Sequence, residues 1–134
     1  LLATLFFSYE LICLATGKNL HSHALPAPLS RYNNEVSGYG NDGDTGDNWQ
    51  VECLQHKQKS AAQNMWESTQ LVRFMHQDTN RWLSSSPKSK FSQTNCPNCP
   101  VHGELEVSGI NRNSDVAGRS SIFQADDGIY LLRQ

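Results

Sequence analysis

Short apolar runs alternate with turn-forming residues along the whole chain. Glycine and proline recur at short intervals, and the apolar runs between them include residues 11–14, 49–54 and 105–110. Many short apolar runs separated by turn residues are typical of β-strands, so the pattern predicts an all-β domain. Residues 55–70 hold scattered apolar side chains without a helical period, and we interpret them as a linker.

The chain opens on an apolar run, residues 1–9. This run fits the end of a secretory signal, which carries about 7–15 apolar residues, and it fits a hydrophobic strand equally well. Because the first residue is Leu1 and not methionine, we expect a fragment, a processed chain or an incomplete gene model.

Three segments of the sequence recur later in the same order. Residues 11–22 align with a second segment at an offset of 63, taken from Leu20 to Leu83. The Glu-Val-Ser-Gly run at 35–38 recurs at an offset of 71, and the run at 49–52 is echoed at an offset of 74. Because the order is kept and the offset only grows, the pattern indicates two units with loop insertions between matched strands.

Each unit follows the same predicted order of strands and turns. A first strand leads into a turn at residues 16–17 or 79–80, where a residue with positive φ is tolerated. Three further strands follow, and four strands per unit suit a β-trefoil, in which three such units surround a pseudo-threefold axis. We divide the chain as follows: an apolar run at 1–9, a unit at 10–54, a linker at 55–70 and a unit at 71–134.

The first unit carries the runs that point to a known family. The segment Thr-Gly-Lys-Asn-Leu-His-Ser-His at 16–23 resembles the "TG-x-x-LHSH" run of the MIR motif, and residues 35–49 resemble its "EVS…G-acidic…DDW" segment. Protein O-mannosyltransferases, inositol trisphosphate and ryanodine receptors and the stromal cell-derived factor two family share this motif, and the last family is the most similar. Its members carry three MIR units and two are visible here, so we predict an incomplete β-trefoil-like MIR domain. Either one unit is lost or another chain supplies it.

The resemblance implies a function without catalysis. It implies a protein of the endoplasmic reticulum lumen that acts in protein quality control and binds non-native client proteins with a J-domain co-chaperone and the chaperone BiP. The alternative is a carbohydrate-binding or regulatory MIR segment of a protein O-mannosyltransferase, with mannose-type glycans as ligands. Neither alternative calls for a cofactor.

The candidate binding residues are polar or aromatic side chains of the recurring runs. His21 and His23 lie on one side of a predicted strand, but no third metal ligand is evident, so we favour a hydrogen-bonded histidine over a metal site. We expect Trp49 in the core and Trp82, beside a turn, to be more exposed. The full set of candidates is His21, His23, Glu35, Trp49, Trp82 and Glu106.

The four cysteines allow several arrangements. Cys96 and Cys99 form a C-x-x-C run, which we interpret as a small disulfide in a loop; thiols paired differently, a zinc site or a redox site remain alternatives. A bond between Cys13 and Cys53 is compatible with the fold, since they open and close one unit. The acidic run at 42–47 does not match the EF-hand pattern, and we interpret it as a solvated turn.

Composition excludes several other classes. Eleven Lys and Arg against 13 Asp and Glu give a net charge of −2, which disfavours a nucleic-acid partner. No apolar run approaches the roughly 20 residues of a membrane-spanning helix. The sequence holds no nucleophile elbow, phosphate-binding loop or metalloprotease motif, and we therefore predict that the chain is not an enzyme.

Overall fold

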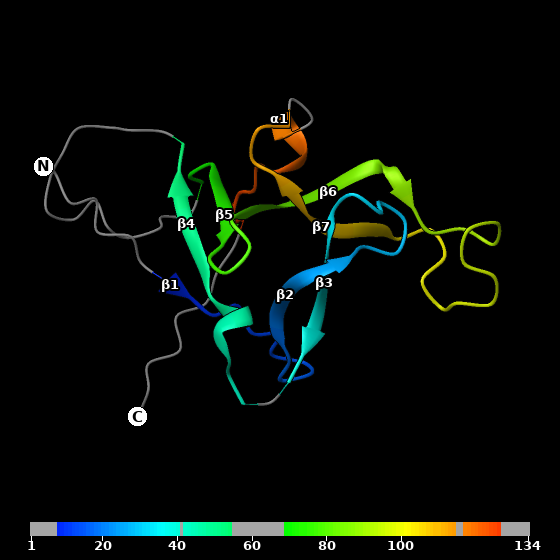
Figure 1. Ribbon diagram of the computed structural model, residues 1–134, viewed down its shortest axis with the longest axis horizontal. Helices are drawn as coiled ribbons and strands as arrows, with labels where there is room; N and C mark the ends of the chain where they lie inside the picture. Colours follow the sequence, from blue (N-terminus) through cyan, green and yellow to red (C-terminus); the bar gives the residue numbers. More distant parts are fainter. Residues whose placement is uncertain (1–7, 41, 55–68, 115–116, 127–134) are drawn as a thin grey trace, which may run out of the picture.

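The computed structural model describes residues 8–40, 42–54, 69–114 and 117–126. Within them, seven strands form one curled antiparallel sheet in the order β1-β4-β5-β6-β7-β3-β2 (Figure 1). The elements are β1 (Ser8–Tyr9), β2 (Asn19–Pro26), β3 (Asn34–Tyr39), the 3-10 helix η1 (Thr45–Asp47), β4 (Trp49–Cys53), β5 (Val72–His76), β6 (Arg81–Lys90), β7 (Leu105–Asn111) and the short helix α1 (Ala117–Ser120). The all-β prediction is confirmed.

The pairing of strands follows the sequence repeat. Adding 63 to a residue of β2 and 71 to its partner in β3 gives a pair between β6 and β7. The equivalent pairs are Leu20↔Gly38 with Leu83↔Gly109, Ile12↔Asn19 with Met75↔Trp82, and, with the later offset, Tyr9↔Trp49 with Val72↔Phe123. The two units therefore share one register, and the repeat is a structural repeat.

The turns of the two units also correspond. Gly17 has a φ of 67° and Asn80 a φ of 55°, so both adopt the left-handed conformation that the sequence predicts. The N–H of Gly17 donates to the carbonyl of Cys13 over 2.8 Å, and the N–H of Asn80 donates to the carbonyl of His76 over 2.9 Å. Each turn thus closes through the same hydrogen bond.

The difference in offset arises after the second strand of each unit. The β2–β3 register shifts between Ser22 and Pro26, and the β6–β7 register shifts between Ser85 and Lys90, at equivalent places. Residues 27–33 then connect β2 to β3, whereas 91–104 connect β6 to β7. The second connection projects beyond the sheet as a long loop (Figure 1).

Strand alternation builds the core. Trp49, Val72, Phe74 and Leu83 form the main buried cluster, and the Trp49 Nε1–H donates to the carbonyl of Leu20 over 2.8 Å. In β5 the buried residues Val72, Phe74 and His76 alternate with half-buried ones, as expected for a strand that buries one face.

Trp82 is only slightly more exposed than Trp49, at 4% against 0%, and both side chains are buried. Its side chain is buried against Ile110, and the guanidinium groups of Arg73 and Arg112 lie 5.4 and 4.9 Å from the ring centroid. Both guanidinium groups are within cation–π distance of the Trp82 ring.

Parts of the sequence analysis fall outside this description. Of the apolar run at 1–9, only Ser8 and Tyr9 are described, and they form β1. Most of the predicted linker, residues 55–68, lies outside the described residues. In the described ranges no helix has the length and apolar character needed to cross a membrane.

Candidate functional site

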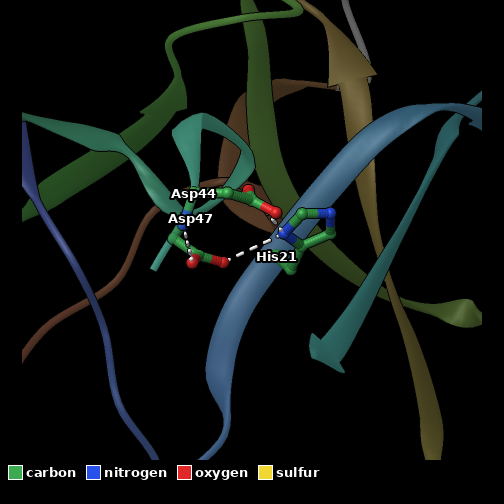
Figure 2. A group of neighbouring side chains, drawn as sticks. All are labelled: His21, Asp44 and Asp47. Carbon is green, nitrogen blue, oxygen red and sulfur yellow. Dashed lines mark hydrogen bonds and ion pairs between the residues drawn. The ribbon is translucent and has the colours of Figure 1, made fainter. Parts of the chain in front are cut away.

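A polar cluster joins β2 to η1 (Figure 2). The Nδ1 of His21 lies 2.9 Å from Asp47 Oδ1 and 3.5 Å from Asp44 Oδ1. Because an ionised carboxylate only accepts hydrogen bonds, Nδ1 of His21 carries a proton and donates it to Asp47 Oδ1. His21 and Asp47 are both buried, so β2 is tied to the turn before β4.

The turn itself is a capping box. Asp44 Oδ1 accepts from the N–H of Gly46 over 2.7 Å, and Asp47 Oδ2 accepts from the N–H of Asp44 over 2.9 Å. Asn19 Nδ2 also donates to Asp47 Oδ2 over 2.9 Å. The interpretation of 42–47 as a solvated turn is therefore wrong for Asp47, whose carboxylate is enclosed by donors.

These contacts set the charge of the aspartate. Burial alone would raise the pKa of Asp47, but hydrogen bonds from the Asp44 N–H, His21 and Asn19 outweigh burial and lower the pKa below its ordinary value. Asp47 is therefore an internal anion held by three donors.

Gly46 is packed between two histidines. A Cβ at this position would collide with Cε1 of His21. On the other side, the Gly46 carbonyl accepts from Nε2 of His76 over 2.8 Å, and Nδ1 of His76 lies 2.8 Å from Oγ1 of Thr79. Burial lowers the pKa of His76, which is fully enclosed. The 3-10 turn is thus held from both units.

His21, Asp44 and Asp47 could in principle hold a metal ion, since their ligand atoms lie within 4.8 Å of one another. Their geometry is instead that of a hydrogen bond that joins β2 to η1. Tetrahedral zinc with bonds of about 2 Å separates its ligands by roughly 3.3 Å, whereas the His21–Asp47 distance of 2.9 Å is that of a hydrogen bond. The expectation of a hydrogen-bonded core histidine is met by His21.

The two glutamates of the recurring runs act differently. Glu106 is buried, and its carboxylate accepts from the N–H groups of Leu29 at 2.5 Å and Ser30 at 3.1 Å, which fixes the connection after β2. Glu35, its counterpart, is half-exposed and lies 3.4 Å from Nε2 of His23. Glu106 is therefore a structural anchor, and the His23–Glu35 pair faces outward.

The predicted residues do not form one site. Trp49 packs beside His76, with ring centroids 4.9 Å apart, whereas Trp82 belongs to a separate cluster. Sequence reasoning missed Asn19, Asp47 and His76. The spacing of Asp44 and Asp47 is a signal for a capping box and could have shown the turn; nothing local marks the burial of His76.

The cysteines follow the prediction in part. Cys96 and Cys99 form a disulfide, and His102 Nε2 donates to the Cys96 carbonyl over 2.6 Å. The bond considered between Cys13 and Cys53 is not made, because Cys13 is exposed beside the first turn while Cys53 Sγ lies 3.6 Å from Gln70 Oε1.

The fold and the site together define a class of protein. A curled antiparallel sheet of repeated units, braced by buried polar contacts, is a β-trefoil-like architecture. The model of the MIR domain matches residues 8–97, and the chain belongs to the MIR domain family.

Three known proteins illustrate the similarity. The chain is 38% identical over 119 residues to "Stromal cell-derived factor 2-like protein" of Dictyostelium discoideum, covering 87% of this chain and 47% of that protein. The crystal structure of the SDF2-like protein from Arabidopsis thaliana matches with a TM-score of 0.75 and 31% identity, over 94% of this chain and 61% of that one.

The third similarity is to dolichyl-phosphate-mannose–protein mannosyltransferase 3 of Saccharomyces cerevisiae. It is 49% identical over 49 residues, which are 35% of this chain and 6% of the enzyme. The chain spans about half the length of the stromal cell-derived factor 2-like protein of Dictyostelium discoideum.

Proposed function

We propose that this chain is a non-enzymatic protein quality-control factor of the endoplasmic reticulum lumen. It binds non-native polypeptides and acts with a J-domain co-chaperone and BiP. The similarity to stromal cell-derived factor 2-like proteins supports this proposal. The observation that carries it is that acidic and histidine side chains are buried and hydrogen-bonded within the fold, whereas several large apolar side chains are exposed to solvent.

Four of the acidic and histidine side chains are engaged inside the fold. His21, Asp47, His76 and Glu106 are all buried, and each is hydrogen-bonded to another part of the chain. Acid–base catalysis needs such groups within reach of a substrate proton. Their role in this fold is to brace the turn and the connection after β2.

Several large apolar side chains, in contrast, are exposed to solvent. Non-native polypeptides expose apolar segments, which bind apolar surface and unpaired strand edges. Among the residues that the structure describes, the exposed large apolar side chains are Ile12, Leu14, Leu25, Tyr32, Tyr39, Val101, Leu105 and Val107.

Suppression of aggregation tests the proposal. A client enzyme is heated with increasing amounts of the chain, and light scattering is followed. We expect scattering to fall as the chain is added. The double variant Ile12→Ser, Leu14→Ser should suppress aggregation of the client less than the single variant Val101→Ser does.

Pull-down with BiP and with a J-domain protein tests the proposed partners. Unchanged scattering at a tenfold excess of folded chain would contradict the proposal.

The alternative is a carbohydrate-binding or regulatory MIR segment of a protein O-mannosyltransferase. The 49-residue similarity to a yeast mannosyltransferase favours it. Specific binding of mannose or of mannosylated peptides on a glycan array, without suppression of aggregation, would establish this alternative in place of the first.

A further inference from the structure

The long loop at 91–104 carries the disulfide between Cys96 and Cys99 and projects beyond the sheet (Figure 1). Both cysteines are half-buried, and the two residues between them are exposed. The disulfide therefore lies at the surface, where a thiol of another molecule can approach it. The proposed function assigns no role to this disulfide.

A β-turn brings the two cysteines together. The Cys99 N–H donates to the Cys96 carbonyl over 3.3 Å, and Asn98 has a φ of 60°. Proline at the second position of a turn and a left-handed residue at the third are the signature of a type II turn, and Pro97 and Asn98 occupy these positions. Because both residues favour this conformation by themselves, we expect the turn to keep the two sulfur atoms close in the reduced chain as well.

Hydrogen bonds hold the loop in addition to the disulfide. The N–H of Phe91 donates to the carbonyl of Glu104, and the N–H of Gly103 donates to the carbonyl of Phe91, each over 2.9 Å. Nearer the tip, the N–H of Ser92 donates to Oδ1 of Asn95 over 2.8 Å. These contacts join residues outside the ring that the disulfide closes, so breaking the sulfur–sulfur bond removes none of them.

A disulfide that closes so short a ring adds little to the stability of a fold. In the chain-entropy account its contribution grows with the number of residues enclosed, and Cys96 and Cys99 are only three positions apart. Structural disulfides resist reduction, whereas exposed disulfides are the labile ones that exchange with thiols. Its position and ring size place the Cys96–Cys99 disulfide in the second group.

We propose that the Cys96–Cys99 disulfide is a thiol–disulfide exchange site that passes its disulfide to a polypeptide with two cysteine thiols. Residues 91–103 hold no Asp or Glu, so no carboxylate of the loop repels an incoming thiolate. The transfer is stoichiometric, with one disulfide given by each chain. This inference goes beyond the proposed function and does not depend on it.

The transfer takes two steps. A thiolate of the incoming polypeptide attacks the sulfur of one loop cysteine, the bond between Cys96 and Cys99 breaks, and the displaced thiolate takes a proton from water. The second thiol of the polypeptide, as its thiolate, then attacks the mixed disulfide and releases the other loop cysteine. The incoming dithiol is oxidised by two electrons and the loop disulfide is reduced by two, so no further oxidant is needed.

A synthetic peptide of residues 91–104 in its dithiol form is the probe, because it closes the same ring as the folded chain. The peptide is mixed with the oxidised 134-residue chain in the absence of oxygen, and thiols are trapped by alkylation. Trypsin cleaves after Lys90 and after Arg112, so the mass of the fragment 91–112 reports on this disulfide alone.

The equilibrium between chain and peptide measures how much the fold stabilises the disulfide, since folding and disulfide formation are linked. We expect the folded chain to hold its disulfide less than about a hundredfold more tightly than the peptide does. A preference above about a hundredfold overturns the inference, because the disulfide is then a structural one.

A matched peptide with serine in place of its second cysteine is the control. It forms the mixed disulfide but cannot complete the transfer, and the neighbouring loop thiol expels it. At the same concentration we expect it to leave about tenfold less of the loop reduced than the dithiol peptide does. Equal reduction of the loop by the two peptides overturns the inference.

Two variants at Asn98 test the turn. Glycine adopts a φ of 60° without strain and a β-branched residue does not. We expect the mixed disulfide with the single-cysteine peptide to accumulate about fivefold more in Asn98→Val than in Asn98→Gly, because the second loop thiol then lies farther from the first. Equal accumulation in the two variants shows that the turn does not serve the exchange and overturns the inference.

Thermal unfolding separates exchange from a purely structural role. We expect the double variant Cys96→Ser, Cys99→Ser to unfold within about 5 °C of the parent chain, because the loop hydrogen bonds remain. A larger fall in Tm identifies a structural disulfide and overturns the inference. Loss of exchange with unchanged suppression of aggregation would leave the proposed function standing.

Discussion

Nε2 of His76 lies 2.8 Å from the carbonyl oxygen of Gly46, and this hydrogen bond joins β5 of the second unit to η1 of the first. A carbonyl only accepts, so Nε2 carries the proton and Nδ1 accepts from the Thr79 hydroxyl. Both ring nitrogens are thus used by the neutral form. A second proton, on Nδ1, would require the Thr79 hydroxyl to turn from donor to acceptor, and burial of the charged ring lowers the pKa of His76.

Stability should therefore depend on pH through His76. The folded pKa lies below that of the unfolded chain, about 6.5, so the unfolded state binds more protons as pH falls below that value. The free energy of unfolding is expected to be constant above about pH 7 and to decrease from about pH 6.5 toward the lowered folded pKa. The measurement is Tm between pH 5 and 8. His76→Gln should flatten the slope, and His102→Gln, at an exposed ring, should not.

Asp47→Asn is expected to destabilise the fold by about 3 kcal/mol. An asparagine has one acceptor oxygen where Asp47 has two. In one orientation its NH2 group meets the Asn19 and Asp44 donors, and in the other it meets Nδ1 of His21. In either case at least one buried donor loses its acceptor. Urea unfolding measures the change. Asp42→Asn, an exposed neighbour, is the control and should shift stability by less than about 0.5 kcal/mol. Equal effects of the two variants would contradict the anchoring role of Asp47.

Glu106→Gln and Glu35→Gln compare equivalent positions of the repeat. Glu106 holds two backbone N–H groups in a buried place, and we expect a loss of about 2 kcal/mol on neutralisation. Glu35 forms a half-exposed pair with His23, and its loss should cost about 0.5 kcal/mol or less. Denaturant midpoints of both variants provide the measurement. A larger loss for Glu35→Gln would show that the buried carboxylate is not the anchor.

The paired glycines offer a second internal comparison. A Cβ at Gly109 would lie 3.3 Å from Cβ of Arg81 and 3.3 Å from Cβ of Asn34, whereas one at Gly38 would lie 3.4 Å from Cβ of Lys18 alone. Gly109→Ala is expected to cost about 1–2 kcal/mol and Gly38→Ala clearly less, because only one neighbour must yield there. Calorimetric Tm values would test the order, and a reversed order would reject this packing argument.

The repeat allowed much of the fold to be predicted. Matching Leu20 with Leu83 and the two Glu-Val-Ser-Gly runs carries the register of the strand pairs, because the side chains of a strand alternate with a fixed period. Both left-handed turn residues follow from Gly17 and Asn80. The bounds given to the two units and to the linker stay predictions.

The site was harder to predict, since burial depends on partners far away in sequence. Asp47 is enclosed by Asn19 and His21, which lie 28 and 26 residues before it. Trp82 is covered by Arg112, and Glu106 binds the backbone near residue 30. No local pattern reports such contacts, so the sequence predicts solvated polar and acidic residues in these turns.

The long loop at 91–104 shows that the sheet tolerates extra chain at this place. It has about twice the length of its counterpart at 27–33, yet the pairs Leu83↔Gly109 and Leu20↔Gly38 keep the same register. The disulfide and the His102 hydrogen bond hold the loop tip independently of the strands. An epitope or fluorescent reporter grafted into this loop is therefore expected to leave the strand pairing unchanged, since the loop lies at the opposite end of the molecule from β1 in Figure 1.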